Sequence, residues 1–407
     1  MIDMYISISM SFYEIITFIT LINLPFFPQQ DSIWVRYIVF AYAVYLLPLA
    51  LRCLVTASGA KQSHEIASSQ APRNDRIIKI FLIFLTVSFI STIFSTNLQT
   101  SYVQLLLFFS YFVIYVTSGS VFNTLQKKER LAGVLIFVTV VLSTISLYNT
   151  LILHYSSKLS RGVSFMWIYF GHNHLSALLI FAIPLCLFVL KTNWDKLGYR
   201  IIFSLIFIFL LYSLILTSAQ ASLISLSIMS YLFFLGYSYR SRQKINFIFV
   251  FWILVVAIVV WSILSRQGMV QLESAIYDLN ISARLMYIKS AVESARLVPF
   301  AGTGLDTYKL INFNSGLGLA KTFYVHNFFF QMLSDTGIFG FVMSIMLIIS
   351  ALWEGGKRVF EQLEANERFF FLMLWLSLLS SALNALVDFD WQLPTVFFIF
   401  WLLTGLI

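Results

Sequence analysis

The sequence predicts an all-α polytopic membrane protein with about twelve transmembrane helices and one large helical loop on its outer face. Its composition is 59% hydrophobic and only 11% charged, with 42 phenylalanines. A soluble globular domain carries charge on about a quarter of its residues. Apolar runs of about 18 residues or more also recur along the whole chain, as membrane-spanning helices require.

The apolar runs divide the chain into spans joined by polar connections, and we treat residues 1–407 as a single transmembrane domain. The first run has no Lys or Arg before it and no small-residue cleavage site, so we expect a retained span and not a signal peptide. The expected spans are 8–27, 33–55, 77–96, 101–125, 131–153, 173–190, 200–217, 219–238, 245–265, 327–353, 369–387 and 391–407.

The positive charges indicate how these spans are oriented. With the N-terminus in the cytoplasm, most of the 26 lysines and arginines fall in cytoplasmic loops, as the positive-inside rule requires. Topology therefore explains most of the net charge of +8, and we expect no nucleic-acid partner. The exception is the outer loop 266–325, between the ninth and tenth spans, which is far longer than the usual helix connection. We expect this loop to carry the active-site elements.

One histidine lies where the outer loop enters the tenth span, in "FYVHNFFFQMLSDTGIFG" (323–340). We expect His326 in the first turn of a helix, where the helix N-terminus and apolar neighbours disfavour the imidazolium. A neutral imidazole near pH 7 is a competent general base. The alternative is a packed, hydrogen-bonded histidine in an interfacial aromatic belt. The run 326–353 is longer than one span needs, and its "SDTG" predicts a break of the helix before Gly337.

A second helical pattern inside the outer loop carries an arginine. The segment "NISARLMYIKSAVESARLVPFAGTG" predicts a helix with Ser282 as its N-cap and Pro299 beyond its end. Arg284 then lies in the first turn, where its guanidinium and free backbone N–H groups can converge on a phosphate. The alternative is an arginine that points to water or pairs with Asp278 or Glu293.

Other polar residues are expected on the same face. The segment "GHNHLSALL" opens the sixth span with Asn173 and His174. His172 and His174 are two residues apart, which is a poor spacing for metal ligands on a helix, so we expect no metal site there. In "ALVDFDWQLP", Asp388 and Asp390 lie in the turn between the last two spans, where a functional carboxylate and a turn cap are both open readings. Gln220 marks the polar tip between spans seven and eight.

The two cysteines, Cys53 and Cys186, lie at or inside apolar runs and offer neither a disulfide framework nor metal-ligand spacing. We expect no metal and no cofactor.

Together these segments resemble the O-antigen ligase and polymerase superfamily of bacterial envelope glycan assembly. The resemblance is carried by the twelve-span layout with its outer loop and covers most of the chain from about residue 165. The matching segments are "GHNHLSALLIFAIPL", "SARLMYIKSAVESARLVPFAGTGLDTY", "VHNFFFQMLSDTGIFG" and "ALVDFDWQLPTVFFIFWLLTGL".

The resemblance implies a GT-C-like membrane fold and a metal-independent, inverting glycosyl transfer on the periplasmic face of the bacterial inner membrane. The donor would be an oligosaccharide on undecaprenyl pyrophosphate, and the acceptor a glycan or lipid A–core. By the family pattern, His326 would take the proton of the acceptor hydroxyl and Arg284 would hold the pyrophosphate.

One position departs from that pattern. Where many members have an arginine between spans seven and eight, this sequence has Gln220, which brings no charge. Either another cation supplies the second phosphate contact, with Arg36, Lys158, Arg161 and Arg266 as the candidates, or this protein is a divergent member of the superfamily. The residues that would support the site are Asn173, His174, Asn327 and Asp388.

The function has three readings at this point. We favour a polymerase that joins lipid-linked repeat units, because Gln220 departs from the arginine of the ligases, and such an enzyme can have a chain-length regulator as a partner. The second reading is an O-antigen ligase that moves the finished glycan to lipid A–core. The third, a transporter, would place ionisable residues near the middle of several spans, where Glu14 is the main candidate.

Overall fold

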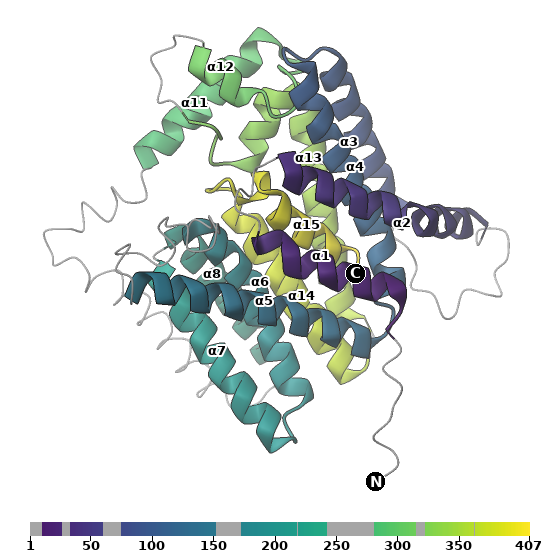
Figure 1. Cartoon of the computed structure of the whole chain (residues 1–407), viewed down its shortest axis with the longest axis vertical. Helices are drawn as coiled ribbons and strands as arrows, with labels where there is room; N and C mark the ends of the chain where they lie inside the picture. Colours follow the sequence, from purple (N-terminus) through teal and green to yellow (C-terminus); the bar gives the residue numbers. More distant parts are fainter. Residues whose placement is uncertain are drawn as a thin grey trace, which may run out of the picture.

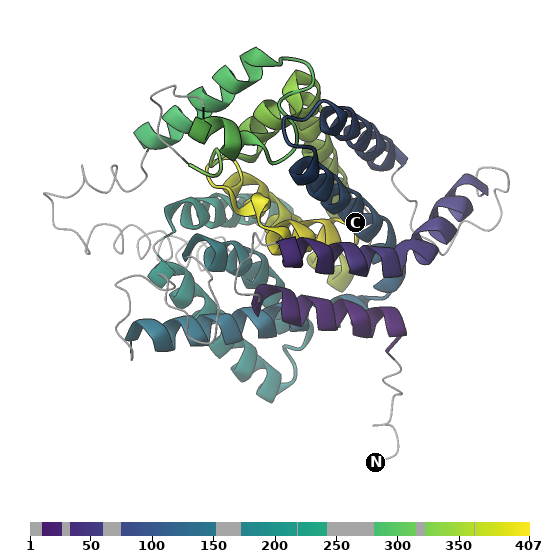
Figure 2. The ribbon, with the colours of Figure 1, turned by 45° about the horizontal axis from the view of Figure 1, so that its top comes forward.

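The computed structural model describes residues 10–26, 33–59, 75–151, 172–217, 219–241, 281–314, 322–361 and 363–407. All secondary structure within these ranges is helical, as the composition predicted (Figures 1 and 2). The helices are α1 (Phe12–Asn23), η1 (Leu24–Phe26), α2 (Ile33–Gly59), α3 (Asp75–Ile93), α4 (Leu98–Val121), α5 (Leu125–Leu151), α6 (His172–Thr192), α7 (Leu197–Thr217), α8 (Gln220–Ser241), α11 (Ile281–Leu297), α12 (Tyr308–Asn314), α13 (Phe328–Phe360), α14 (Ala365–Asn384), η4 (Asp390–Gln392) and α15 (Pro394–Thr404).

Seven of the described helices are long and apolar enough to cross a membrane, namely α2 to α7 and α13. Shorter apolar helices cover Phe12–Phe26, Gln220–Leu232 and Pro394–Thr404, which overlap the first, eighth and last expected spans. The polytopic helical class is therefore confirmed, while the number of twelve spans stays a prediction. The expected ninth span, 245–265, lies outside the described residues.

The last helix forms the centre of the bundle. Every residue of α15 from Pro394 to Thr404 is buried, which is typical of a helix that is apolar on all sides. It packs against α4, α2 and α14, while α6 packs against α14, α5 and α7, and α3 packs against α13. Trp401 and Phe81 are in contact with ring centroids 4.6 Å apart, so aromatic packing joins α15 to α3.

Basic residues gather at one end of the bundle. Arg130 donates a hydrogen bond of 2.8 Å to the buried Glu14, and Lys127 lies 3.5 Å from the same carboxylate. Lys128 and Lys191 lie over the rings of Phe371 and Phe369. The positive-inside rule placed all four of these basic residues in cytoplasmic loops. The structure brings them together at one end of the bundle.

The long helix α13 is broken where the sequence predicted. Gly337 has φ 68° and ψ −167°, which no helical residue adopts, and it separates the short half-helix 328–336 from the continuation 338–360. A Cβ atom at Gly337 would lie 2.6 Å from the backbone carbonyl carbon of Phe300, so only glycine fits here. The break therefore admits the backbone of the outer loop against the helix.

The outer loop contains two helices, α11 and α12, which lie together at the upper end of the view in Figure 1. The structure corrects one detail of the prediction, because Ser282 lies inside α11 and not at its N-cap. The predicted end of this helix is confirmed, since α11 stops at Leu297, two residues before Pro299.

Candidate active site

Several segments that are far apart in the sequence meet at one end of the bundle, which we call the site face. The start of α13 is fixed to the turn after α14, because the N–H of Phe328 donates to the carbonyl of Ala385 at 3.0 Å. The side-chain amide of Asn327 donates to the carbonyl of Leu386 at 2.7 Å. The same face receives the start of α6 and the helix α11, as the contacts below show.

His326 lies just outside the helix that it was expected to open. Asn327 is the N-cap of α13, and its Oδ1 accepts hydrogen bonds from the backbone N–H groups of Phe329 and Phe330. Asn327 is therefore accounted for as a cap. His326 precedes this cap with φ 57°, a left-handed conformation that is strained for a residue with a Cβ and is concentrated at functional sites.

The imidazole of His326 faces a buried carboxylate. Its Nδ1 lies 3.5 Å from Oδ1 of Asp388 and has no hydrogen-bond partner among the described residues. The Asp388 side chain is 3% exposed, whereas that of His326 is 23% exposed, so solvent reaches the imidazole and not the acid. Burial of Asp388 opposes its ionisation, but the facing His326 and the positive charge of Arg284 together lower the pKa of this carboxyl below its ordinary value. Asp388 is therefore an ionised partner for His326 at neutral pH.

Two aromatic rings fix the orientation of this imidazole. Tyr287 stacks on His326 with ring centroids 5.3 Å apart and an interplanar angle of 26°. Phe389 meets the imidazole edge to face at 4.6 Å and 76°. The rings that touch His326 come from α11 and from the turn after α14, and not from its neighbours in the sequence.

A second histidine and a second aspartate form a parallel pair beside the first. Nδ1 of His174, at the start of α6, lies 3.1 Å from Oδ1 of Asp390. The other oxygen of Asp390 accepts a hydrogen bond of 2.6 Å from the side-chain amide of Asn384. Burial and the nearby charge of Asp388 raise the pKa of Asp390 to about 6, against the opposing effect of His174. The two aspartates of one turn therefore ionise at different pH.

Phe389 separates the two pairs. Its ring meets His174 edge to face at 5.4 Å, meets His326 in the same way at 4.6 Å, and stacks on Tyr324 at 5.2 Å. Because one ring contacts both imidazoles, we expect a substitution of Phe389 to affect both pairs.

The second pair continues into a chain of hydrogen bonds that reaches α8. Ser222 donates to Oδ1 of Asn384 at 3.1 Å, and its hydroxyl lies 2.8 Å from that of Ser176. Ser176 in turn donates to the backbone carbonyl of Asn173 at 2.6 Å. Gln220 is the first residue of α8, and its Oε1 is buried with no hydrogen-bond partner among the described residues. Gln220 precedes Ser222, a member of these hydrogen bonds, by two residues in the sequence.

Arg284 belongs to the same face through α11. It lies one turn before Tyr287, the ring that stacks on His326, and its charge contributes to lowering the pKa of Asp388. The pairing with Glu293 that the sequence left open is not formed, because Glu293 pairs with Arg296 at 2.8 Å. An arginine, an imidazole and an ionised aspartate therefore occupy one end of the bundle.

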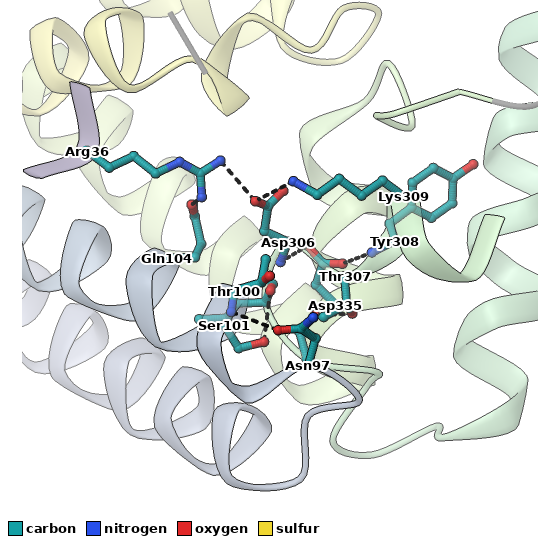
Figure 3. A network of polar contacts seen from close by, with 12 residues as sticks. Arg36, Asn97, Thr100, Ser101, Gln104, Asp306, Thr307, Tyr308, Lys309 and Asp335 are labelled. Carbon is teal, nitrogen blue, oxygen red and sulfur yellow. Dashed lines mark hydrogen bonds and ion pairs between the residues drawn. The ribbon is translucent and has the colours of Figure 1, made fainter. Parts of the chain in front are cut away.

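The other arginine candidates are not all found at this site. Arg36, on α2, is 6% exposed and forms an ion pair of 2.9 Å with Asp306 of the outer loop, where Lys309 is also bound (Figure 3). Its charge is thus already matched by a carboxylate. The remaining candidates, Lys158, Arg161 and Arg266, lie outside the described residues. In the part of the chain that the structure describes, no three His, Cys, Asp or Glu residues are arranged to hold a metal ion.

Some residues of this site were missed by sequence reasoning. The pairing of Asp390 with His174 and the shared ring of Phe389 join segments about 200 residues apart, and no local pattern reports such a contact. The signal that was available is the acid–aromatic–acid triplet 388–390 in a turn between two apolar helices.

The fold and the site define a polytopic helical membrane protein that holds histidine, aspartate and arginine side chains together at one face. Residues 205–345 match the family model described as O-antigen ligase, and this match supports the O-antigen ligase and polymerase superfamily. The matched range includes Gln220, Arg284 and His326, while Asp388 lies beyond it. No curated protein matches the chain significantly.

Proposed function

We propose that the chain is an inner-membrane glycosyltransferase that moves a glycan from undecaprenyl pyrophosphate to an acceptor hydroxyl on the periplasmic face. The observation that carries the proposal is the His326–Asp388 pair, placed beside the helix that bears Arg284. A base, its orienting carboxylate and a fixed cation are what a displacement at an anomeric carbon requires.

In this proposal His326 is the general base. Its Nδ1 side faces Asp388, which leaves Nε2 as the nitrogen that takes a proton. As the acceptor oxygen forms its bond to the anomeric carbon, the hydroxyl proton passes to Nε2 of His326. The Asp388 carboxylate holds the imidazole in the productive tautomer and stabilises the imidazolium that forms. A single displacement of this kind inverts the configuration at the anomeric carbon.

The leaving group is undecaprenyl pyrophosphate, which departs with the electron pair of the broken carbon–oxygen bond. Its negative charge grows as the bond breaks, so fixed donors that face it lower the barrier. Arg284 is the residue we assign to this role, because its planar guanidinium can bind phosphate oxygens in a bidentate way. No metal takes part in the proposed reaction.

We favour a polymerase of lipid-linked repeat units, with Gln220 in place of an arginine as the sequence feature that supports it. The second candidate is the O-antigen ligase, which the description of the matching family model favours. Both use the same chemistry and differ only in the acceptor.

The deletion of the gene in its host, followed by gel analysis of the surface glycan, tests the proposal. A polymerase predicts that the ladder of chain lengths is lost while single repeat units remain attached. A ligase predicts bare lipid A–core together with lipid-linked polymer that accumulates. An unchanged surface glycan would refute both candidates.

A further inference from the structure

A buried carboxylate near the site takes no part in the proposed reaction. Asp335 lies in the half-helix 328–336 of α13 and is 1% exposed. It accepts hydrogen bonds from the backbone N–H groups of Asp306 at 3.0 Å and Tyr308 at 3.2 Å (Figure 3). It also accepts one from the side-chain amide of Gln331 at 3.0 Å. The first two partners belong to the outer loop and the third belongs to its own helix. Asp335 thus joins two parts of the molecule.

Gln331 extends this connection to the catalytic base. Its Oε1 accepts a hydrogen bond of 3.1 Å from the backbone N–H of Val325, the residue before His326. The amide of Gln331 is oriented by Asp335, because its Nε2 donates to the carboxylate. The backbone next to His326, which adopts a left-handed conformation, is therefore fixed by a side chain of α13.

The loop is held to α13 and to the bundle by further contacts. The backbone N–H groups of Thr303 and Gly304 donate to the carbonyls of Ser334 and Asp335 at 3.0 and 2.9 Å. Asp306 adopts φ 56° and directs its carboxylate to Arg36 and Lys309. These two cations compensate the charge of Asp306 at the point where the loop meets α13.

The same half-helix also holds the helix that carries Arg284. The hydroxyl of Ser334 donates to that of Ser294 on α11 at 2.9 Å. The hydroxyl of Tyr308 donates to the backbone carbonyl of Tyr287 on α11 at 3.4 Å. Both the base and the arginine-bearing helix are therefore attached to the turn of α13 around Asp335.

We propose that Asp335 is a positioning residue that, through Gln331 on one side and the loop 303–308 on the other, sets His326 and Arg284 in register for one substrate. The base must meet the acceptor while the arginine meets the leaving group, and a misplacement of about 1 Å in such an arrangement costs about a hundredfold in rate. A buried carboxylate that accepts several hydrogen bonds is suited to this role, because water cannot reach its donors and replace it as their acceptor. The catalytic consequence rests on the proposed function, whereas the structural connection does not.

Hydrogen exchange measured by mass spectrometry, on the full chain in lipid nanodiscs, tests the connection directly. Gln331→Met keeps the hydrogen bonds between Asp335 and the loop but removes the acceptor of Val325. We expect exchange in 322–327 to become about tenfold faster while 303–308 keeps its protection. Asp335→Asn places an amide where three donors converge, so both segments are expected to exchange faster. The matched control is Glu293→Gln, which breaks only an exposed ion pair on α11 and should change neither segment.

The surface glycan of the host supplies the second measurement. We expect Gln331→Met, at a normal protein level, to lower the amount of glycan polymer about tenfold or more, and Glu293→Gln to leave it unchanged. Unchanged exchange in 322–327 for Gln331→Met would overturn the proposal, and so would faster exchange with a normal glycan. Full activity of a variant without His326 would instead refute the proposed function and leave the exchange result standing. Should Asp335→Asn fail to fold, the comparison of Gln331→Met with its control still decides.

Discussion

Asp388 and Asp390 lie two residues apart in one turn and face two different histidines, one before α13 and one at the start of α6. Successive turn residues point in different directions, so a single tight turn can orient two imidazoles at once. The ring of Phe389 contacts both imidazoles edge to face. The pair at His326 is the one that shares its surroundings with Arg284, and we assign the chemistry to it.

Replacement of the base is the most direct test of the site. We expect His326→Ala to lower transfer by about 10² to 10⁴, because general base catalysis contributes that much. Protein level and membrane insertion should stay normal, since the side chain is partly exposed and lies outside α13. The measurement is the glycan ladder of a host that carries only the variant. His64→Ala, in the linker between the second and third expected spans, is the matched control, and wild-type laddering by His326→Ala would remove the base assignment.

Arg284 is expected to act through the shape of its guanidinium and not only through its charge. We predict that Arg284→Lys keeps about a tenth of the activity, because an ammonium cannot reproduce bidentate contact with a phosphate. Arg284→Ala should fall further. Arg296→Lys serves as the control, since this arginine lies in the last turn of the same helix and is 71% exposed. Equal glycan yield from Arg284→Lys and the wild type would rule out the bidentate contact.

The second pair predicts a dependence of stability on pH. The pKa of Asp390 is raised to about 6, so the folded state binds its proton more tightly than the unfolded chain does. The protonation of Asp390 therefore stabilises the folded state fully below the ordinary carboxyl pKa, and this stabilisation is lost as the pH rises through about 6. We expect the difference in Tm between the wild type and Asp390→Asn to shift against the wild type as the pH rises from 4 to 7. A difference that stays constant over this range would contradict the assignment.

The break in α13 predicts a large effect from one methyl group. Gly337→Ala forces a left-handed conformation on alanine and places its Cβ 2.6 Å from the carbonyl carbon of Phe300. We expect it to destabilise the protein by about 1–3 kcal/mol or more. Gly133→Ala is the control, because Gly133 lies inside α5 with no atom near its missing Cβ, and this change should be neutral or slightly stabilising. Thermal unfolding of both variants in detergent makes the comparison, and equal Tm values would show that the loop yields to the added methyl.

Much of this architecture could be read from the sequence because it is set by local chemistry. Apolar runs give the helices, and Gly337 gives the break, since each depends on residues that are close along the chain. The prediction that His326 lies in the first turn of a helix was wrong, because Asn327 is the N-cap and α13 begins only at Phe328.

The pairings could not be predicted in the same way. The partner of His326 lies 62 residues further on and that of His174 lies 216 residues further on, so only the packing of helices brings them together. Arg36 is a second case in which the sequence did not reveal the partner of a charged side chain. As a lone cation on the outer face it was a candidate for phosphate, and the fold gives it Asp306 instead.

The break at Gly337 also determines how firmly the outer loop is attached to α13. The backbone N–H of Ile338 donates to the carbonyl of Pro299 at 2.9 Å, and the carbonyls of Ser334 and Asp335 accept from the outer loop. Moving this loop away from α13 would leave these backbone groups without their partners, which costs free energy for each group that stays buried. Backbone hydrogen bonds on both sides of the break therefore hold residues 299–308 against α13. In the proposed reaction, the substrate would meet a segment that is already fixed in place before it binds.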